Sequence, residues 1–136
     1  MKRRMIMSCH AKFLSCDQCR NILEVIRSDN SAVYECCGRT MKELVANTSE
    51  GAAEKHIPVV EMEGNHVTVK VGSVYHPMTE EHSIDWVYLE TEKGCQRVHF
   101  SKTEEPVAGF TLQDGDRAIA AYAFCNLHGF WKTEIH

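Results

Sequence analysis

The sequence predicts an all-β protein in which a small N-terminal module precedes a larger β-sandwich or barrel. After residue 54, short segments rich in β-branched residues alternate with turns that contain glycine or proline, and no long stretch shows helical periodicity. Before residue 46, four clustered cysteines lie in a segment too short to bury a sufficient apolar core by itself. The polar stretch 47–51 separates the two patterns, so we expect domains at residues 1–45 and 46–136.

Composition excludes several classes of protein. The chain has 136 residues, of which 43% are hydrophobic and 25% charged, which is enough for a packed core. A net charge of −4 leaves no basic surface for nucleic acid. No apolar run reaches the roughly 18 residues that a membrane span needs. The apolar stretch near the N-terminus is shorter than the roughly 7 residues of a secretory signal, so we expect a cytoplasmic protein without a membrane partner.

The N-terminal module reads as a miniature β structure. An extended piece leads to a cysteine knuckle, and the apolar run 22–26 and the polar turn 28–31 separate it from a second cysteine pair. In a reducing compartment clustered thiols bind metal more often than they form disulfides. We therefore expect a metal site formed by the four clustered cysteines, Cys16, Cys19, Cys36 and Cys37. The adjacent pair can face one ion only if the chain turns there, which Gly38 makes easier. Four thiolates suit zinc or iron, and the residues alone do not separate the two metals.

The larger domain is predicted to consist of successive short strands. We expect them at residues 57–61, 66–71, 84–91, 96–100, 110–112 and 118–124. Val67, Val69 and Val71 alternate with polar residues, so this strand should bury one face. Evenly spaced short strands with intervening turns are typical of a sandwich or barrel.

A second set of metal-binding side chains lies in this domain, in turn-rich contexts: His56, His76, His82, Cys125 and His128. Four imidazoles and one thiolate exceed the four ligands of tetrahedral zinc, whereas iron accepts five and keeps a sixth position open. A thiolate ligand donates electron density to iron, which favours chemistry on reduced oxygen species. The alternative is that these histidines are ordinary turn residues, as the other four histidines are expected to be. The combined spacing favours a metal site.

Two charged residues directly precede the first of these histidines. Lys55 is expected to attract a small anion towards an open metal position, although the whole chain is negatively charged. Glu54 is expected to occupy the sixth position of ferric iron when no substrate is bound. The alternative is that both side chains are merely solvated.

The remaining conspicuous residues are assigned to packing or left open. Trp86 and Trp131 are expected to pack in the core or at its rim, with shielding of an imidazole by Trp86 as a lesser alternative. Cys95 is expected to be a small buried hydrophobe. Neither Cys95 nor Cys9 is assigned to a site.

The chain resembles the desulfoferrodoxins, two-iron superoxide reductases with an N-terminal desulforedoxin-like module. The motifs that carry the resemblance are Cys16-Asp17-Gln18-Cys19, Cys36-Cys37-Gly38, Glu54-Lys55-His56-Ile57-Pro58, residues 71–78, His82-Ser83-Ile84-Asp85-Trp86 and Cys125-Asn126-Leu127-His128-Gly129. Tyr75 and Ser83 depart from the family pattern, which commonly has proline and an aromatic residue there. Neither departure affects a ligand.

The resemblance implies one iron on the four cysteines and a catalytic iron with the four histidines in a plane and Cys125 as the axial ligand. It implies an immunoglobulin-like catalytic domain, usually dimeric. We therefore expect one-electron reduction of superoxide to hydrogen peroxide, with electrons from an external donor such as rubredoxin. Two alternatives are an electron carrier without substrate chemistry and a zinc-stabilised β-sandwich that only binds partners.

Overall fold

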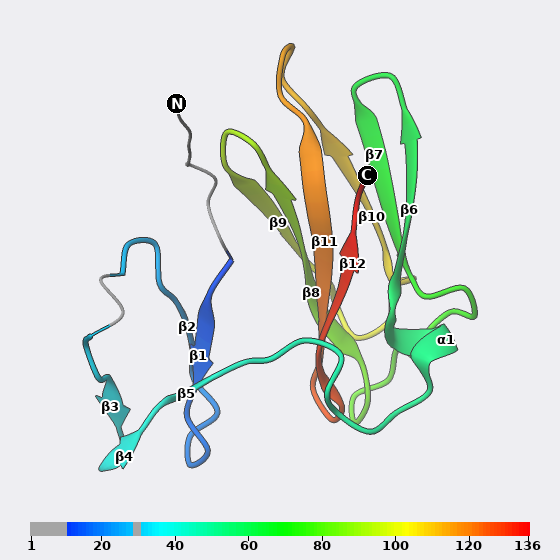
Figure 1. Ribbon diagram of the computed structural model, residues 1–136. Helices are drawn as coiled ribbons and strands as arrows, with labels where there is room; N and C mark the ends of the chain where they lie inside the picture. The colour runs from blue at the N-terminus through cyan, green and yellow to red at the C-terminus, as the bar shows by residue number, and fades with distance from the viewer. Residues whose placement is uncertain (1–10, 29–30) are drawn as a thin grey trace. The chain divides into compact units, whose positions relative to one another are not determined.

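The structure is a computed structural model that describes residues 11–28 and 31–136 (Figure 1). It divides into two compact units, His10–Val45 and a unit that contains Ala46–His136. Almost every regular element is a strand; the helical part of the described residues is one turn, α1 (Ala53–His56). The all-β prediction is therefore confirmed. Within the described residues no helix is long and apolar enough to span a membrane.

The described residues of the smaller unit form five short strands. Its three-stranded antiparallel sheet has the order β2-β1-β5 and consists of β1 (Phe13–Ser15), β2 (Ile22–Glu24) and β5 (Lys42–Glu43). A separate hairpin pairs β3 (Glu35–Cys36) with β4 (Arg39–Thr40). A small cluster of buried side chains, Leu14, Cys16 and Met41, packs against the partly buried Val25 and Cys36. So small an apolar cluster stabilises a unit of this size only weakly.

The larger unit is a sandwich of two antiparallel sheets (Figure 1). One sheet has the order β10-β7-β6 and consists of β6 (Pro58–Glu63), β7 (His66–Val71) and β10 (Val107–Thr111). The other has the order β12-β11-β8-β9 and consists of β8 (Ile84–Thr91), β9 (Cys95–His99), β11 (Ala118–Cys125) and β12 (Gly129–Glu134).

Both sheets contribute to one apolar core. Val67, Val69 and Val71 of β7 are fully buried, which confirms the alternation predicted for that strand. Val87 and Leu89 of β8 pack into the same core from the opposite sheet. Cys125 at the end of β11 belongs to this cluster as well, so a metal-binding thiol lies at the edge of a rigid, close-packed interior.

In the larger unit, two of the described elements were not predicted from the sequence. Strand β12 shows no polar–apolar alternation, because the consecutive residues Phe130 and Trp131 are both buried, one on each face of the sheet. Helix α1 is a single turn, too short to show a helical period, and it lies just after the stretch expected to be a linker.

Candidate metal centres

The smaller unit gathers the four clustered cysteines at one place. Their sulfur atoms all lie within 4.8 Å of one another, and the Sγ atoms of Cys19 and Cys36 are 3.4 Å apart. The knuckle after β1 carries Cys16 and Cys19, and the backbone N–H of Cys19 donates a hydrogen bond to Cys16 Sγ at 3.5 Å. Cys36 and Cys37 lie at the tip of the β3–β4 hairpin.

The chain does turn between the two adjacent cysteines, as the sequence predicted. Cys37 and Gly38 form a two-residue hairpin loop, with φ angles of 55° and 72°. Positive φ at both positions is the pattern of a type I′ turn, which glycine adopts without strain. The turn brings the Sγ atoms of Cys36 and Cys37 within 3.9 Å of each other, so side chains that a straight strand would separate face one point.

Two of these thiols, Cys16 and Cys36, have pKa values shifted in opposite directions. The backbone N–H of Cys19 lowers the pKa of Cys16 to about 6, against the opposing effect of burial. Hydrogen bonds with Cys19 and Cys16 raise the pKa of Cys36 to about 12, because this thiol donates to neighbouring sulfurs that carry the negative charge. The cluster therefore favours one thiolate and resists the next. A cation with affinity for thiolates resolves this conflict, because it lets all four sulfurs ionise together.

The larger unit gathers the other five predicted side chains, from positions far apart in the chain. Donor atoms of His56, His76, His82, Cys125 and His128 all lie within 4.8 Å of one another. His56 ends α1, His76 follows the loop after β7, and His82 precedes β8. Cys125 ends β11, and His128 lies in the connection to β12.

The ring nitrogens face a common centre. His56 Nε2 lies 3.1 Å from His76 Nε2 and 3.2 Å from His128 Nδ1. Cys125 Sγ lies 3.3 Å from His76 Nε2 and 3.9 Å from His128 Nδ1, and accepts a hydrogen bond from the backbone N–H of His128. His82 Nε2 is buried without a hydrogen-bond partner among the described residues. Five donors so close together, one of them a buried nitrogen without a partner, fit a metal ion.

Backbone carbonyls orient two of the imidazoles. His56 Nδ1 lies 2.8 Å from the carbonyl oxygen of Ala52, and His76 Nδ1 lies 2.7 Å from that of Pro77. A ring nitrogen that donates to a carbonyl carries the proton, which leaves Nε2 as the lone-pair donor. This second hydrogen bond is typical of metal-binding histidines, because it fixes both the tautomer and the ring orientation.

Burial keeps these imidazoles neutral. Burial lowers the pKa of His76 to about 4, and it is also the main cause of the lowered pKa values of His56 and His82. Burial raises the pKa of the Cys125 thiol. At neutral pH His56, His76 and His82 are therefore ready to bind a cation, whereas Cys125 requires the cation in order to lose its proton.

The structure places Lys55 and Glu54 on α1, directly before His56. Both side chains are exposed. Burial is the largest cause of the lowered pKa values of His56 and His82, and the positive charge of Lys55 adds to it. The field of Lys55 therefore reaches these two imidazoles. The backbone carbonyl of Glu54 accepts hydrogen bonds from the backbone N–H of Val74 at 3.0 Å and from Ser73 Oγ at 3.2 Å, which anchors the helix.

Two residues of this site were not predicted from the sequence. Trp131 stacks on the His56 ring, with centroids 4.8 Å apart, and its indole Nε1 donates to the His128 carbonyl at 3.1 Å. Gly51 approaches both rings: a Cβ there would lie 3.1 Å from His56 Cε1 and 3.3 Å from His128 Cγ. The position of Trp131, three residues after His128, is a weak local signal for such a contact, whereas imidazole shielding was the lesser alternative for Trp86. Trp86 instead stacks on Phe124.

The prediction for Cys95 was wrong, since its side chain is exposed. It begins β9, an edge strand of the four-stranded sheet, and the next two residues of that strand are exposed as well. Local sequence does not distinguish an edge strand from a central one. Cys9 lies outside the described residues.

The donor sets define a class of protein. Thiolate donors in a group of four suit iron or zinc, whereas four imidazoles with one thiolate exceed the tetrahedral set of zinc and suit iron. An all-β protein with both groups has the make-up of a non-haem iron protein with two mononuclear centres.

Comparison with known proteins agrees with this class. The family model for desulfoferrodoxin matches residues 48–134. A desulfoferrodoxin homolog of Archaeoglobus fulgidus is 42% identical over 87% of this chain and 92% of its own length. The desulfoferrodoxin of Syntrophotalea carbinolica is 42% identical over 88% of this chain and 92% of its own length. The crystal structure of the superoxide reductase from Treponema pallidum matches with a TM-score of 0.79 and 38% identity, covering 94% of this chain and 100% of that chain.

The chain belongs to the desulfoferrodoxin family. Its four-cysteine group and its group of four histidines and one cysteine match the two iron sites of that family.

Proposed function

We propose that this chain reduces superoxide to hydrogen peroxide at an iron ion bound by His56, His76, His82, His128 and Cys125. The main support is the convergence of these five donors within 4.8 Å, at the edge of a packed core. Family membership and the likeness to a solved superoxide reductase support the same activity. The chain is accordingly an oxidoreductase that acts on superoxide.

The chain's own residues bind and orient the reactants. When bound, a ferrous ion supplies one electron, which together with two protons converts superoxide to hydrogen peroxide. Lys55 attracts the superoxide anion, because its charge lies on the exposed turn directly before His56. Glu54 on the same turn offers a carboxylate that would be a hard oxygen ligand for ferric iron. Cys125 is fully buried, so its thiolate is shielded from water.

The smaller unit supplies the second centre. We assign Cys16, Cys19, Cys36 and Cys37 as ligands of its iron, in a desulforedoxin-like module at residues 1–45 that precedes a catalytic domain at residues 46–136. The division of the structure between Val45 and Ala46 supports the boundary between the two. The electron that returns the catalytic iron to its ferrous state comes from an external donor of the rubredoxin type.

The setting of the enzyme is also a proposal. We expect a cytoplasmic homodimer; the six described cysteines are free thiols, as a reducing compartment would keep them. Sedimentation of the iron-loaded protein checks the dimer, and reduction of the catalytic iron by added reduced rubredoxin checks the donor. Monomeric sedimentation or failure of rubredoxin to reduce the iron would contradict the corresponding part.

Replacing Cys125 with serine tests the catalytic assignment. The variant should lose superoxide consumption and the visible absorption of the thiolate-bound catalytic iron, while the four-cysteine iron keeps its own absorption. Iron content and stopped-flow decay of superoxide measure both effects. Unchanged superoxide consumption by the variant would remove the catalytic assignment. If the unmodified iron protein never consumes superoxide, it is an electron carrier. If the unmodified protein is colourless and contains zinc, it is a binding module.

A further inference from the structure

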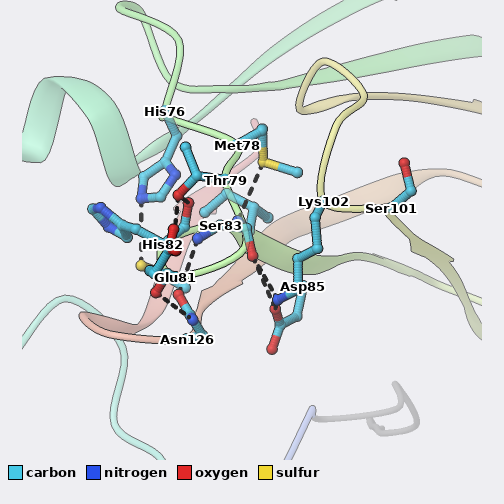
Figure 2. Close-up of polar contacts among 12 residues, drawn as sticks. His76, Met78, Thr79, Glu81, His82, Ser83, Asp85, Ser101, Lys102 and Asn126 are labelled. Atoms are coloured by element: carbon cyan, nitrogen blue, oxygen red, sulfur yellow. Dashed lines mark hydrogen bonds and ion pairs between the residues drawn. The ribbon is translucent and has the colours of Figure 1, made fainter.

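A polar cluster lies beside the catalytic donors and is not explained by metal binding. The hydroxyl of Ser83, a residue with 0% exposure, accepts a hydrogen bond from Lys102 Nζ at 2.8 Å. The same Nζ lies 3.4 Å from Asp85 Oδ1, and Ser83 Oγ lies 3.5 Å from that carboxylate oxygen. Figure 2 shows Lys102 and Asp85 meeting Ser83 on the side away from His76 and His82.

The backbone of Ser83 also connects the neighbourhoods of two metal-binding residues, His82 and Cys125. It directly follows His82, and its N–H donates to Asn126 Oδ1 at 3.0 Å (Figure 2). The backbone N–H of Asn126, the residue after Cys125, donates to the Ser83 carbonyl at 3.1 Å. The Asn126 amide then donates to the Glu81 carbonyl at 3.0 Å. Ser83, whose hydroxyl contacts the charged pair, is therefore held in place between His82 and the residue that follows Cys125.

The pair contributes little stability but acts electrostatically on the site. The side chains of Lys102 and Asp85 are 36% and 37% exposed, and ion pairs with that exposure stabilise a fold only slightly. Asp85 directly follows Ile84, the residue of β8 that pairs with Cys125 of β11, so its negative charge lies on the strand beside that ligand. Lys102 brings a positive charge to the same place.

We propose that Lys102 and Asp85, positioned by Ser83, set the reduction potential of the iron bound at Cys125. This inference rests on the proposed function, because it requires iron at that group. A negative charge near the iron stabilises the ferric state and a positive charge stabilises the ferrous state. The two side chains therefore act in opposite directions, and the buried Ser83 hydroxyl contacts both of them.

Redox titration of the iron-loaded protein, followed by the absorption of the catalytic iron, tests the proposal. Lys102→Met should lower the potential and Asp85→Asn should raise it, each changing the ferric-to-ferrous ratio at a fixed potential roughly two- to tenfold. A tenfold change corresponds to 59 mV for one electron. The double variant should return towards the native value, and Lys102→Arg should keep it.

Arg117→Met is the matched control. Arg117 forms an exposed ion pair with Glu92 at 2.9 Å, at the ends of β11 and β8 opposite to Cys125 and His82. Its loss removes one positive charge from the chain but should leave the potential unchanged. Potentials that stay constant, or that move in the same direction in both single variants, would overturn the proposal while the superoxide reductase assignment stands. Absence of the catalytic iron absorption from the native protein would overturn both.

Discussion

The two metal-binding groups differ in how much of their geometry exists before a metal binds. In the smaller unit, Cys19 and Cys37 are exposed, and the nearby cluster of buried side chains is small: Leu14, Met41 and Cys16, itself one of the four cysteines. In the larger unit, His56 and His76 are each 2% exposed and Cys125 is 0% exposed, at the edge of a two-sheet core. The smaller unit therefore depends on its metal in order to fold. The donor atoms of the larger unit are positioned by a fold that is stable without metal.

Metal removal should reveal the largest difference between the two units, in whether each stays folded. Binding of a structural metal by thiolates contributes on the order of 10 kcal/mol, which exceeds the stability that a unit of this size obtains from its core. After complete chelation we expect His10–Val45 to lose its slowly exchanging amides, while the core strands β7, β8 and β11 keep theirs. Hydrogen exchange resolved by residue measures this. Joint unfolding of both units would contradict the difference in preorganisation.

Replacing Trp131 with alanine should weaken the larger unit's site from within its fold. The change removes the ring stacked on His56 and the hydrogen bond to the His128 carbonyl, and loss of a buried tryptophan costs about 3–5 kcal/mol. We expect faster iron loss from the histidine group, measured as release to a chelator. Trp86→Ala is the control, since Trp86 stacks on Phe124 and should cost similar stability. Equal iron loss in both variants would reduce the role of Trp131 to packing.

The residues that could and could not be predicted differ in a physical way. The metal-binding side chains were identifiable because donor type, spacing and turn residues are local properties, as in Cys36-Cys37-Gly38. Trp131 and Lys102 were missed because their partners come from other strands or loops: His56 lies 75 positions before Trp131, and Ser83 lies 19 before Lys102. Strand register brings such pairs together, and a single sequence does not reveal register.

Acid should destabilise the metal-free sandwich through its buried imidazoles. The pKa of His76 is lowered from 6.5 to about 4 by burial, so the unfolded chain takes up this proton more readily than the folded one. The stability it contributes is complete above pH 6.5 and is lost as the pH falls towards 4. This amounts to about 2 kcal/mol between about pH 7 and pH 5.

Urea unfolding of metal-free protein at the two pH values measures the effect. His76→Gln should reduce the pH dependence by most of that amount, whereas replacement of the exposed His66 should leave it unchanged. An unaltered dependence in His76→Gln would show that other groups in the sandwich take up the protons.

Removing one positive charge near each metal-binding group should show which group attracts superoxide. We expect this effect to be the smallest of those predicted here. Lys55 lies beside the histidine group, and its field reaches His56 and His82, so Lys55→Met should slow superoxide capture roughly two- to tenfold at low ionic strength. The difference should shrink as salt rises, because the Debye length falls to about 10 Å at 0.1 M. Lys42→Met is the matched control: Lys42 pairs with Asp17 at 3.2 Å, beside the four-cysteine group, and should not affect capture. Equal salt dependence in both variants would mean that net charge, and not the position of Lys55, governs the approach of the anion.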